Sequence, residues 1–267
     1  MSKLLIVNAD DFGLCRELSS GIIKAYEEGI VTSTTAVSTG SYLDEGIEFL
    51  KNSGIDAGVH LTFVGGEKPL TGHIDGLVDE KGCFLKDYSA VVPRILFNRF
   101  DREALRKELI AQTEKLKDSG LTVSHMDGHQ HLHTLPAIRD MVFHIAERFN
   151  IKWIRIPESH KSGIKSMGLN FFSKGLKERA KKEGLRYADS FEGFDFSGKA
   201  HMENIRPVLN SLKAGITELM VHPGFDASSL FDWDFEWEAE LEALTCGETK
   251  KILADKGITL TDYGSLS

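Results

Sequence analysis

Short apolar runs alternate with longer stretches of helical period along nearly the whole chain, and no other sequence feature limits the fold as strongly. Such alternation is typical of repeated βα units that build a mainly parallel sheet. We expect eight strands, at Lys3–Ala9, Thr34–Ser38, Ala57–Thr62, Thr122–Met126, Trp153–Ile156, Arg186–Phe191, Leu219–His222 and Ile258–Thr261. Eight strands with intervening helices predict a single α/β domain folded as a (β/α) barrel of the TIM type.

Helix signals fill the gaps between these strands. Asp101 can cap a helix that ends near Gly120, and Pro136 lies in a first helical turn, where its missing N–H costs nothing. We expect helices at Arg16–Glu28, Asp101–Gly120, Leu135–Phe149, Phe171–Glu183 and Trp237–Lys256.

One connection is much longer than the others. The segment Val64–Phe100 is a glycine-dotted insertion after the third strand. Connections of this length are usually functional or mobile. Since His60 lies at the end of the third strand, the insertion is expected to cover the same face of the barrel as that histidine.

The composition is that of a globular protein with one domain over residues 1–267. The chain is 41% hydrophobic and 27% charged. Its formal net charge of −8 argues against nucleic acid or a membrane surface as partner and fits a small neutral or cationic substrate. Three widely spaced cysteines, with no apolar stretch of signal-peptide or membrane-span length, predict a cytoplasmic protein.

Four histidines and an aspartate crowd the segment Ser124–His133, which points to a metal. Imidazole and carboxylate ligands suit a divalent ion, and the absence of a CxxC pair favours a site open to water and substrate. Alternate residues of an extended segment point to opposite faces, so not every histidine can be a ligand. His125, His131 and His133 are as consistent with supporting or substrate-contacting roles as with ligation.

Ionisable residues recur at the carboxyl ends of the expected strands, where α/β barrels build their active sites. These residues are Asp10, Asp11, His60, Asp127, His129, Arg155 and His222. Taken alone, the aspartate pair could form a turn and cap a helix, His60 could be a core histidine bonded to a carbonyl, and His222 could begin a turn. Together they predict one pocket.

Six segments of the chain resemble the YdjC-like carbohydrate deacetylase family, which includes chitooligosaccharide deacetylases. They are Leu4–Leu14, Gly29–Ala36, Gly58–Leu61, His125–His133, Arg155–Pro157 and Val221–Gly224. The first segment and the histidine segment are specific when found together. The resemblance implies a distorted barrel and hydrolysis of an N-acetyl group from a mono- or oligosaccharide such as chitobiose.

The resemblance also assigns roles to individual residues. Asp11, His60 and His129 match the family's metal ligands, and Asp10 matches its catalytic base. The family metal is usually Mg²⁺, although two imidazoles and one carboxylate would bind Zn²⁺, Mn²⁺ or Co²⁺ more tightly. The resemblance allows a homodimer.

We hypothesise a mechanism in which the metal polarises the acetamide carbonyl and activates water. Asp10 accepts the proton of the water. His222 donates a proton to the departing amine, because histidine titrates near neutral pH. Arg155 orients Asp10 or keeps it ionised, and Asp127 positions a histidine.

Three other functions compete with this one. The same strand ends could serve a phosphoesterase-type hydrolase or a metal-dependent sugar isomerase. Acetate release would separate either from a deacetylase. A non-enzymic metal-binding protein would instead bind several ions and be insensitive to Asp10→Asn. Trp233 and Trp237 could stack on a sugar ring or pack a helix.

Overall fold

The computed structural model describes residues 2–267, which form one parallel sheet surrounded by helices. Its strands are β1 (Lys3–Phe12), β2 (Ser33–Ala36), β3 (Asp56–Leu61), β4 (Val123–Gly128), β5 (Trp153–Ile154), β6 (Ser190–Glu192), β7 (Gly215–Val221) and β8 (Ile258–Leu260). Each overlaps an expected strand, so the prediction of a parallel α/β fold is confirmed.

The sheet is a curled half-barrel with the strand order β5-β4-β3-β2-β1-β7-β6. Strand β8 lies beside the first residues of β1, and β7 pairs directly with β1 along its other edge. Within residues 2–267, the end strands β5 and β6 do not pair with each other, and one bridge joins Trp153 to Arg186. The barrel is therefore distorted, with a strand order that a closed TIM barrel does not have.

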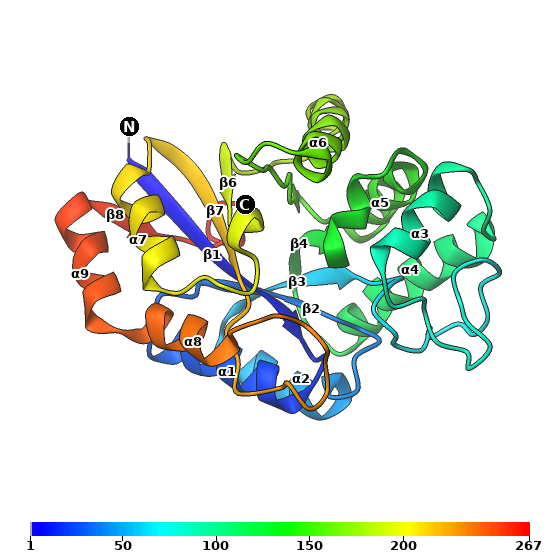
Figure 1. Ribbon diagram of the computed structural model, residues 1–267, viewed down its shortest axis with the longest axis horizontal. Helices are drawn as coiled ribbons and strands as arrows, with labels where there is room; N and C mark the ends of the chain where they lie inside the picture. The colour runs from blue at the N-terminus through cyan, green and yellow to red at the C-terminus, as the bar shows by residue number, and fades with distance from the viewer. Residues whose placement is uncertain (1) are drawn as a thin grey trace.

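Helices surround the sheet, with α8 beside α1 and α4 beside α5 (Figure 1). They are α1 (Arg16–Glu27), α2 (Leu43–Ser53), α3 (Tyr88–Leu96), α4 (Arg102–Asp118), α5 (Pro136–Phe149), α6 (Ile164–Glu183), α7 (Met202–Ser211), α8 (Trp237–Thr245) and α9 (Gly247–Lys256), with short 3₁₀ turns η1 (His129–Thr134) and η2 (Phe194–Phe196). None of the helices in the described part of the chain has the length and apolar character needed to cross a bilayer.

Several of these helices differ from the sequence expectation. Helices α3 and α7 contain Pro93 and Pro207, residues that usually mark a helix end, and neither helix was expected. Because α3 lies inside Val64–Phe100, that segment is not one structureless connection. The single helix expected over Trp237–Lys256 is wrong, since Cys246 is extended (ψ 151°) and separates α8 from α9.

Strand β1 sorts its side chains onto two faces. Leu5, Val7 and Ala9 belong to the main apolar core. On the other face, Ile6 packs with Trp153 and Tyr263. Alternation along the strand thus fills the space under the helices with aliphatic groups and directs the even-numbered residues to the concave side of the sheet.

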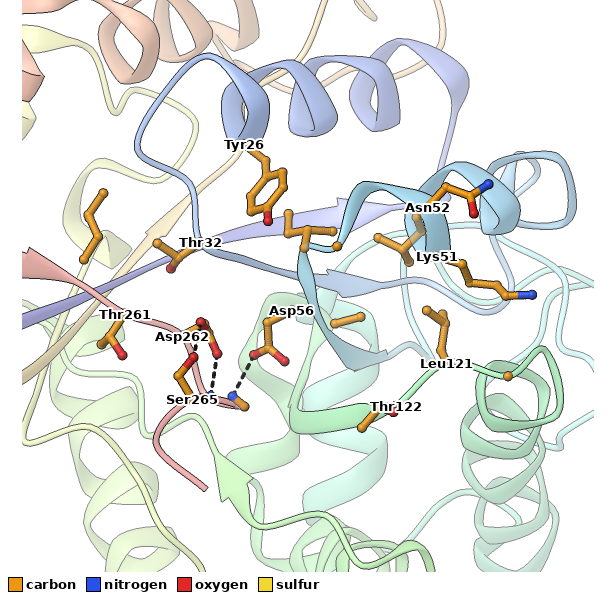
Figure 2. Close-up of a pocket in the computed structure, with 17 residues that line it drawn as sticks. Tyr26, Thr32, Lys51, Asn52, Asp56, Leu121, Thr122, Thr261, Asp262 and Ser265 are labelled. Atoms are coloured by element: carbon orange, nitrogen blue, oxygen red, sulfur yellow. Dashed lines mark hydrogen bonds between the residues drawn. The ribbon is translucent and has the colours of Figure 1, made fainter.

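A pocket of about 860 Å³ lies at the amino ends of β2 and β3, opposite the expected site. Figure 2 shows Asp56, Asp262 and Ser265 close together at its wall. The Gly264 N–H donates to Asp56 Oδ2 over 3.2 Å, and the Ser265 N–H donates to Asp262 Oδ1 over 2.6 Å. The first contact ties the C-terminal segment to β3 and the second stabilises a turn within that segment, and none of the predicted site residues lines this pocket.

Candidate metal and acid–base site

An irregularity at the end of β1 brings two adjacent aspartates to the same side. The pairing register with β2 shifts between Ala9 and Phe12, and Asp11 has a left-handed φ of 73°. Adjacent side chains of a regular strand point to opposite faces. Here Asp10 contacts Arg155, while Asp11 approaches His60, and all four residues are buried. The strand bulge therefore places both carboxylates in one site.

Three ligand-type atoms meet at the carboxyl ends of β1, β3 and β4. Asp11 Oδ1 lies 3.1 Å from His129 Nδ1 and 3.4 Å from His60 Nε2, and these two nitrogens are 3.2 Å apart. Ligands bound to one ion at about 2.0–2.2 Å lie roughly 3 Å from each other. Asp11 Oδ1 is also buried without a hydrogen-bond partner. The three residues fit a divalent cation.

Asp127 orients one of these histidines. Its Oδ1 lies 2.6 Å from His60 Nδ1, so that nitrogen holds the proton and Nε2 presents its lone pair to Asp11 and His129. Burial lowers the pKa of His60, but nearby carboxylates, Asp127 foremost, raise it to about 9. The surroundings of His60 favour positive charge, whether from a proton or from a bound cation.

Arg155 is the centre of a buried charge network. Its guanidinium contacts both oxygens of Asp10, at 2.6 and 2.7 Å, and lies 2.5 Å from Asp127 Oδ2 and 2.5 Å from Glu218 Oε1. Burial raises the pKa of Asp10, but the Arg155 charge outweighs burial and holds that pKa well below its usual range. Asp10 is thus ionised and held in one orientation.

His222 follows β7 and lies near both aspartates. Its backbone N–H donates to Glu240 Oε2 over 2.5 Å, and its Nδ1 is buried without a partner. Val221 pairs with Ala9 in the sheet, so His222 and Asp10, the next residues along, lie at the same end of β7 and β1. This register places His222 beside the aspartate pair.

Aromatic side chains of the segment 231–237 cover this end of the barrel. Trp233 lies 5.7 Å from the His129 ring and stacks on Phe231 at 4.7 Å, while Phe235 packs on His222 at 5.0 Å. Trp237 is buried in an apolar cluster that includes Leu18 of α1, and half-buried Trp233 packs against the same cluster. Trp237 is therefore a packing residue, whereas Trp233 keeps part of its side chain exposed.

The other histidines of the cluster, His125, His131 and His133, do not belong to the group of potential ligands formed by Asp11, His60 and His129 in the described residues. His125 joins Ser124 to Asn8 and stacks on Tyr263 at 3.9 Å, and burial lowers its pKa to about 3. His133 Nε2 lies 3.1 Å from the Arg155 carbonyl oxygen. His131 packs on Phe191 and Phe194. These three histidine side chains pack around the charge network of Arg155.

Four residues of the site were not identified from the sequence: Asn8, Thr35, Glu67 and Glu218. Asn8 and Thr35 connect the charged groups, because Thr35 Oγ1 lies 3.3 Å from Asp127 Oδ2 and Asn8 Nδ2 donates to Asp10 Oδ1 over 2.9 Å. Asn8 and Glu218 are polar residues inside mainly apolar strands, and that signal could have found them, whereas Thr35 lies in the hydroxyl-rich strand β2 and does not stand out. Glu67, in the long connection, has no such signal.

Comparison with known proteins gives consistent matches. A model of the YdjC-like protein family matches residues 4–255. A carbohydrate deacetylase of Thermoanaerobacter pseudethanolicus is 29% identical over 270 residues, 99% of each chain. One from Vibrio parahaemolyticus is 32% identical over 272 residues, 98% of this chain and 96% of its own. The crystal structure of a candidate cellobiose-phosphate cleavage protein from Enterococcus faecalis has a TM-score of 0.83 and 28% identity, and covers 100% of both chains.

Proposed function

Because this chain belongs to the YdjC-like family, we propose that residues 1–267 form one metal-dependent carbohydrate deacetylase domain that removes the N-acetyl group of a chitobiose-like sugar. The observation that carries the proposal is the convergence of Asp11, His60 and His129 beside an aspartate fixed by Arg155. The curated relatives named above are carbohydrate deacetylases, which supplies the reaction class.

Each charged group has a place in amide hydrolysis. Asp11, His60 and His129 would hold the divalent cation, which supplies Lewis acidity toward an amide carbonyl and toward water. Asp10 accepts a proton from the attacking water as the carbon–oxygen bond forms. His222 gives a proton to the sugar nitrogen as the carbon–nitrogen bond breaks, so that acetate and a free amine result.

The contacts of Asp10 limit how it can act as a base. Its carboxylate offers about four acceptor positions. Arg155 uses two of them, Asn8 reaches Oδ1 at 2.9 Å, and Thr35 lies 3.4 Å from the same oxygen. Three of these donors share Oδ1, whereas Oδ2 accepts only from Arg155 among the described residues, so Oδ2 offers the acceptor position that takes the proton.

Acetate release tests the proposal. Metal-stripped protein is restored separately with Mg²⁺, Mn²⁺, Co²⁺ or Zn²⁺ and given N-acetylglucosamine, N,N'-diacetylchitobiose or a longer chitooligosaccharide. We expect acetate from at least one sugar, only with metal. No acetate from folded, metal-loaded protein with any of these sugars would contradict the proposal.

A second candidate is cleavage of a phosphorylated disaccharide, which the description of the Enterococcus faecalis relative favours. The charges of this site speak against it, since the single guanidinium of Arg155 already faces Asp10, Asp127 and Glu218. A dianionic phosphate would add repulsion. Cellobiose phosphate belongs in the same substrate panel, and its cleavage without acetate release from the others would establish the second function.

The role of His222 gives a separate prediction. We expect His222→Ala to keep its metal while kcat falls by about 10²–10⁴-fold, the usual contribution of a general acid. The measurements are metal content after dialysis and acetate release at saturating sugar. Near-normal turnover of this variant would exclude His222 as the acid, and loss of its metal would make it a support of the metal site instead.

A further inference from the structure

Glu67 carries a buried oxygen that nothing in the described chain uses. Its Oε2 has no hydrogen-bond partner. The nearby Gly65 has a φ of 117°, and a Cβ atom built on it would lie 2.7 Å from Glu67 Oε2 and 3.4 Å from His129 Nε2. These two atoms therefore face each other across the space that a side chain at position 65 would fill.

The fold holds this part of the connection in place. The Gly65 N–H donates to the Leu85 carbonyl over 3.0 Å, and the Phe84 N–H donates to the Glu67 carbonyl over 2.8 Å. Further along, buried Glu108 of α4 accepts from the backbone N–H groups of Leu70, at 3.0 Å, and of Thr71, at 2.7 Å. Hydrogen bonds before and after Glu67 thus fix the backbone that carries it toward His129.

The two histidines of the metal site differ in what supports them. His60 presents Nε2 to the site and has Asp127 on Nδ1. His129 presents Nδ1, and this nitrogen makes all of its ring hydrogen bonds within residues 2–267. When Nδ1 binds a cation, the proton of the neutral ring is on Nε2, and metal-bound histidines almost always donate that proton to an acceptor.

We propose that Glu67 is a positioning residue for His129, whose Nε2–H its carboxylate accepts when a divalent cation is bound by Asp11, His60 and His129. The inference rests on the metal site of the proposed function. With this contact, each imidazole ligand has a carboxylate on its second ring nitrogen: Asp127 for His60 and Glu67 for His129. A small rotation of the Glu67 side chain, or one bridging water, closes the contact.

Titration of metal-free protein with Co²⁺, followed by the visible absorption of the bound ion, tests the proposal without a sugar. Glu67→Ala is expected to weaken Co²⁺ binding by about 10–100-fold, the usual cost of removing such a partner. Glu67→Gln should recover most of that loss, because an amide oxygen also accepts the hydrogen bond. The matched control is Glu80→Ala, an exposed glutamate of the same connection, which should bind like the unmodified chain.

Two results would overturn the proposal: Co²⁺ binding by Glu67→Ala that equals that of the unmodified chain, or Glu67→Gln binding as weakly as Glu67→Ala. The metal-free melting temperature of both variants should not fall below that of the unmodified chain, because Oε2 makes no hydrogen bond within the described residues that either substitution could remove. His129→Ala is the reference. If it too binds Co²⁺ normally, the metal site itself is wrong, whereas its failure to bind beside a normal Glu67→Ala rejects only the role of Glu67.

Discussion

Arg155→Met is expected to lower the free energy of unfolding by roughly 3–5 kcal/mol, the usual cost of removing one partner from a buried ion pair. The substitution leaves Asp10, Asp127 and Glu218 buried beside one another without their shared cation. Arg155 is 1% exposed, so water cannot replace it. Urea unfolding followed by circular dichroism measures the change.

Two further variants sharpen this experiment. Arg106 forms an exposed pair with Glu103, and Arg106→Met should change the free energy of unfolding far less than Arg155→Met, because water surrounds both partners. The free energy of unfolding of Arg155→Lys should lie between those of Arg155→Met and Arg106→Met. A lysine ammonium keeps the charge but cannot bind both oxygens of Asp10 in parallel. If Arg155→Met proved as stable as Arg106→Met, the network would not stabilise the fold.

His129→Ala is expected to abolish metal binding and acetate release together. The substitution removes one of the three ligand-type atoms. We therefore expect metal affinity to fall by more than the roughly 10–100-fold that follows from removing a residue that only hydrogen-bonds to a ligand. Metal content after dialysis and acetate release give the two readings. His144→Ala, an exposed histidine of α5, is the control. A variant at His129 that retained full metal content would remove this residue from the ligand set.

Local sequence patterns were sufficient to predict the strands and the strand ends that carry charge. Short apolar runs such as Leu4–Val7 predict where a strand lies, and the position of its carboxyl end follows directly from that. Helices α3 and α7 could not be predicted in the same way. Packing holds Pro93 and Pro207 inside helices, and a local rule reads each proline as a helix end.

The orientation of the side chains within the site was harder to predict than the identity of the residues that form it. Asp10 and Asp11 are adjacent in the sequence, but only the bulge in β1 determines that both belong to the same site. Glu218 reads as one polar residue of an apolar strand, and its contact with Arg155 depends on β7 pairing directly with β1. Strand order and register depend on contacts between residues far apart in the chain, and local patterns in a single sequence do not reveal them.

The left-handed φ of Asp11 means that selection for thermostability can act against a residue of the metal site. A side chain in that conformation costs about 1–3 kcal/mol, and glycine adopts it freely. Asp11→Gly therefore relieves backbone strain, although it also removes the carboxylate that faces His60 and His129. Selection for heat resistance alone rewards relief of strain whether or not a ligand is kept, so a thermostability screen of this chain needs an activity filter at every round.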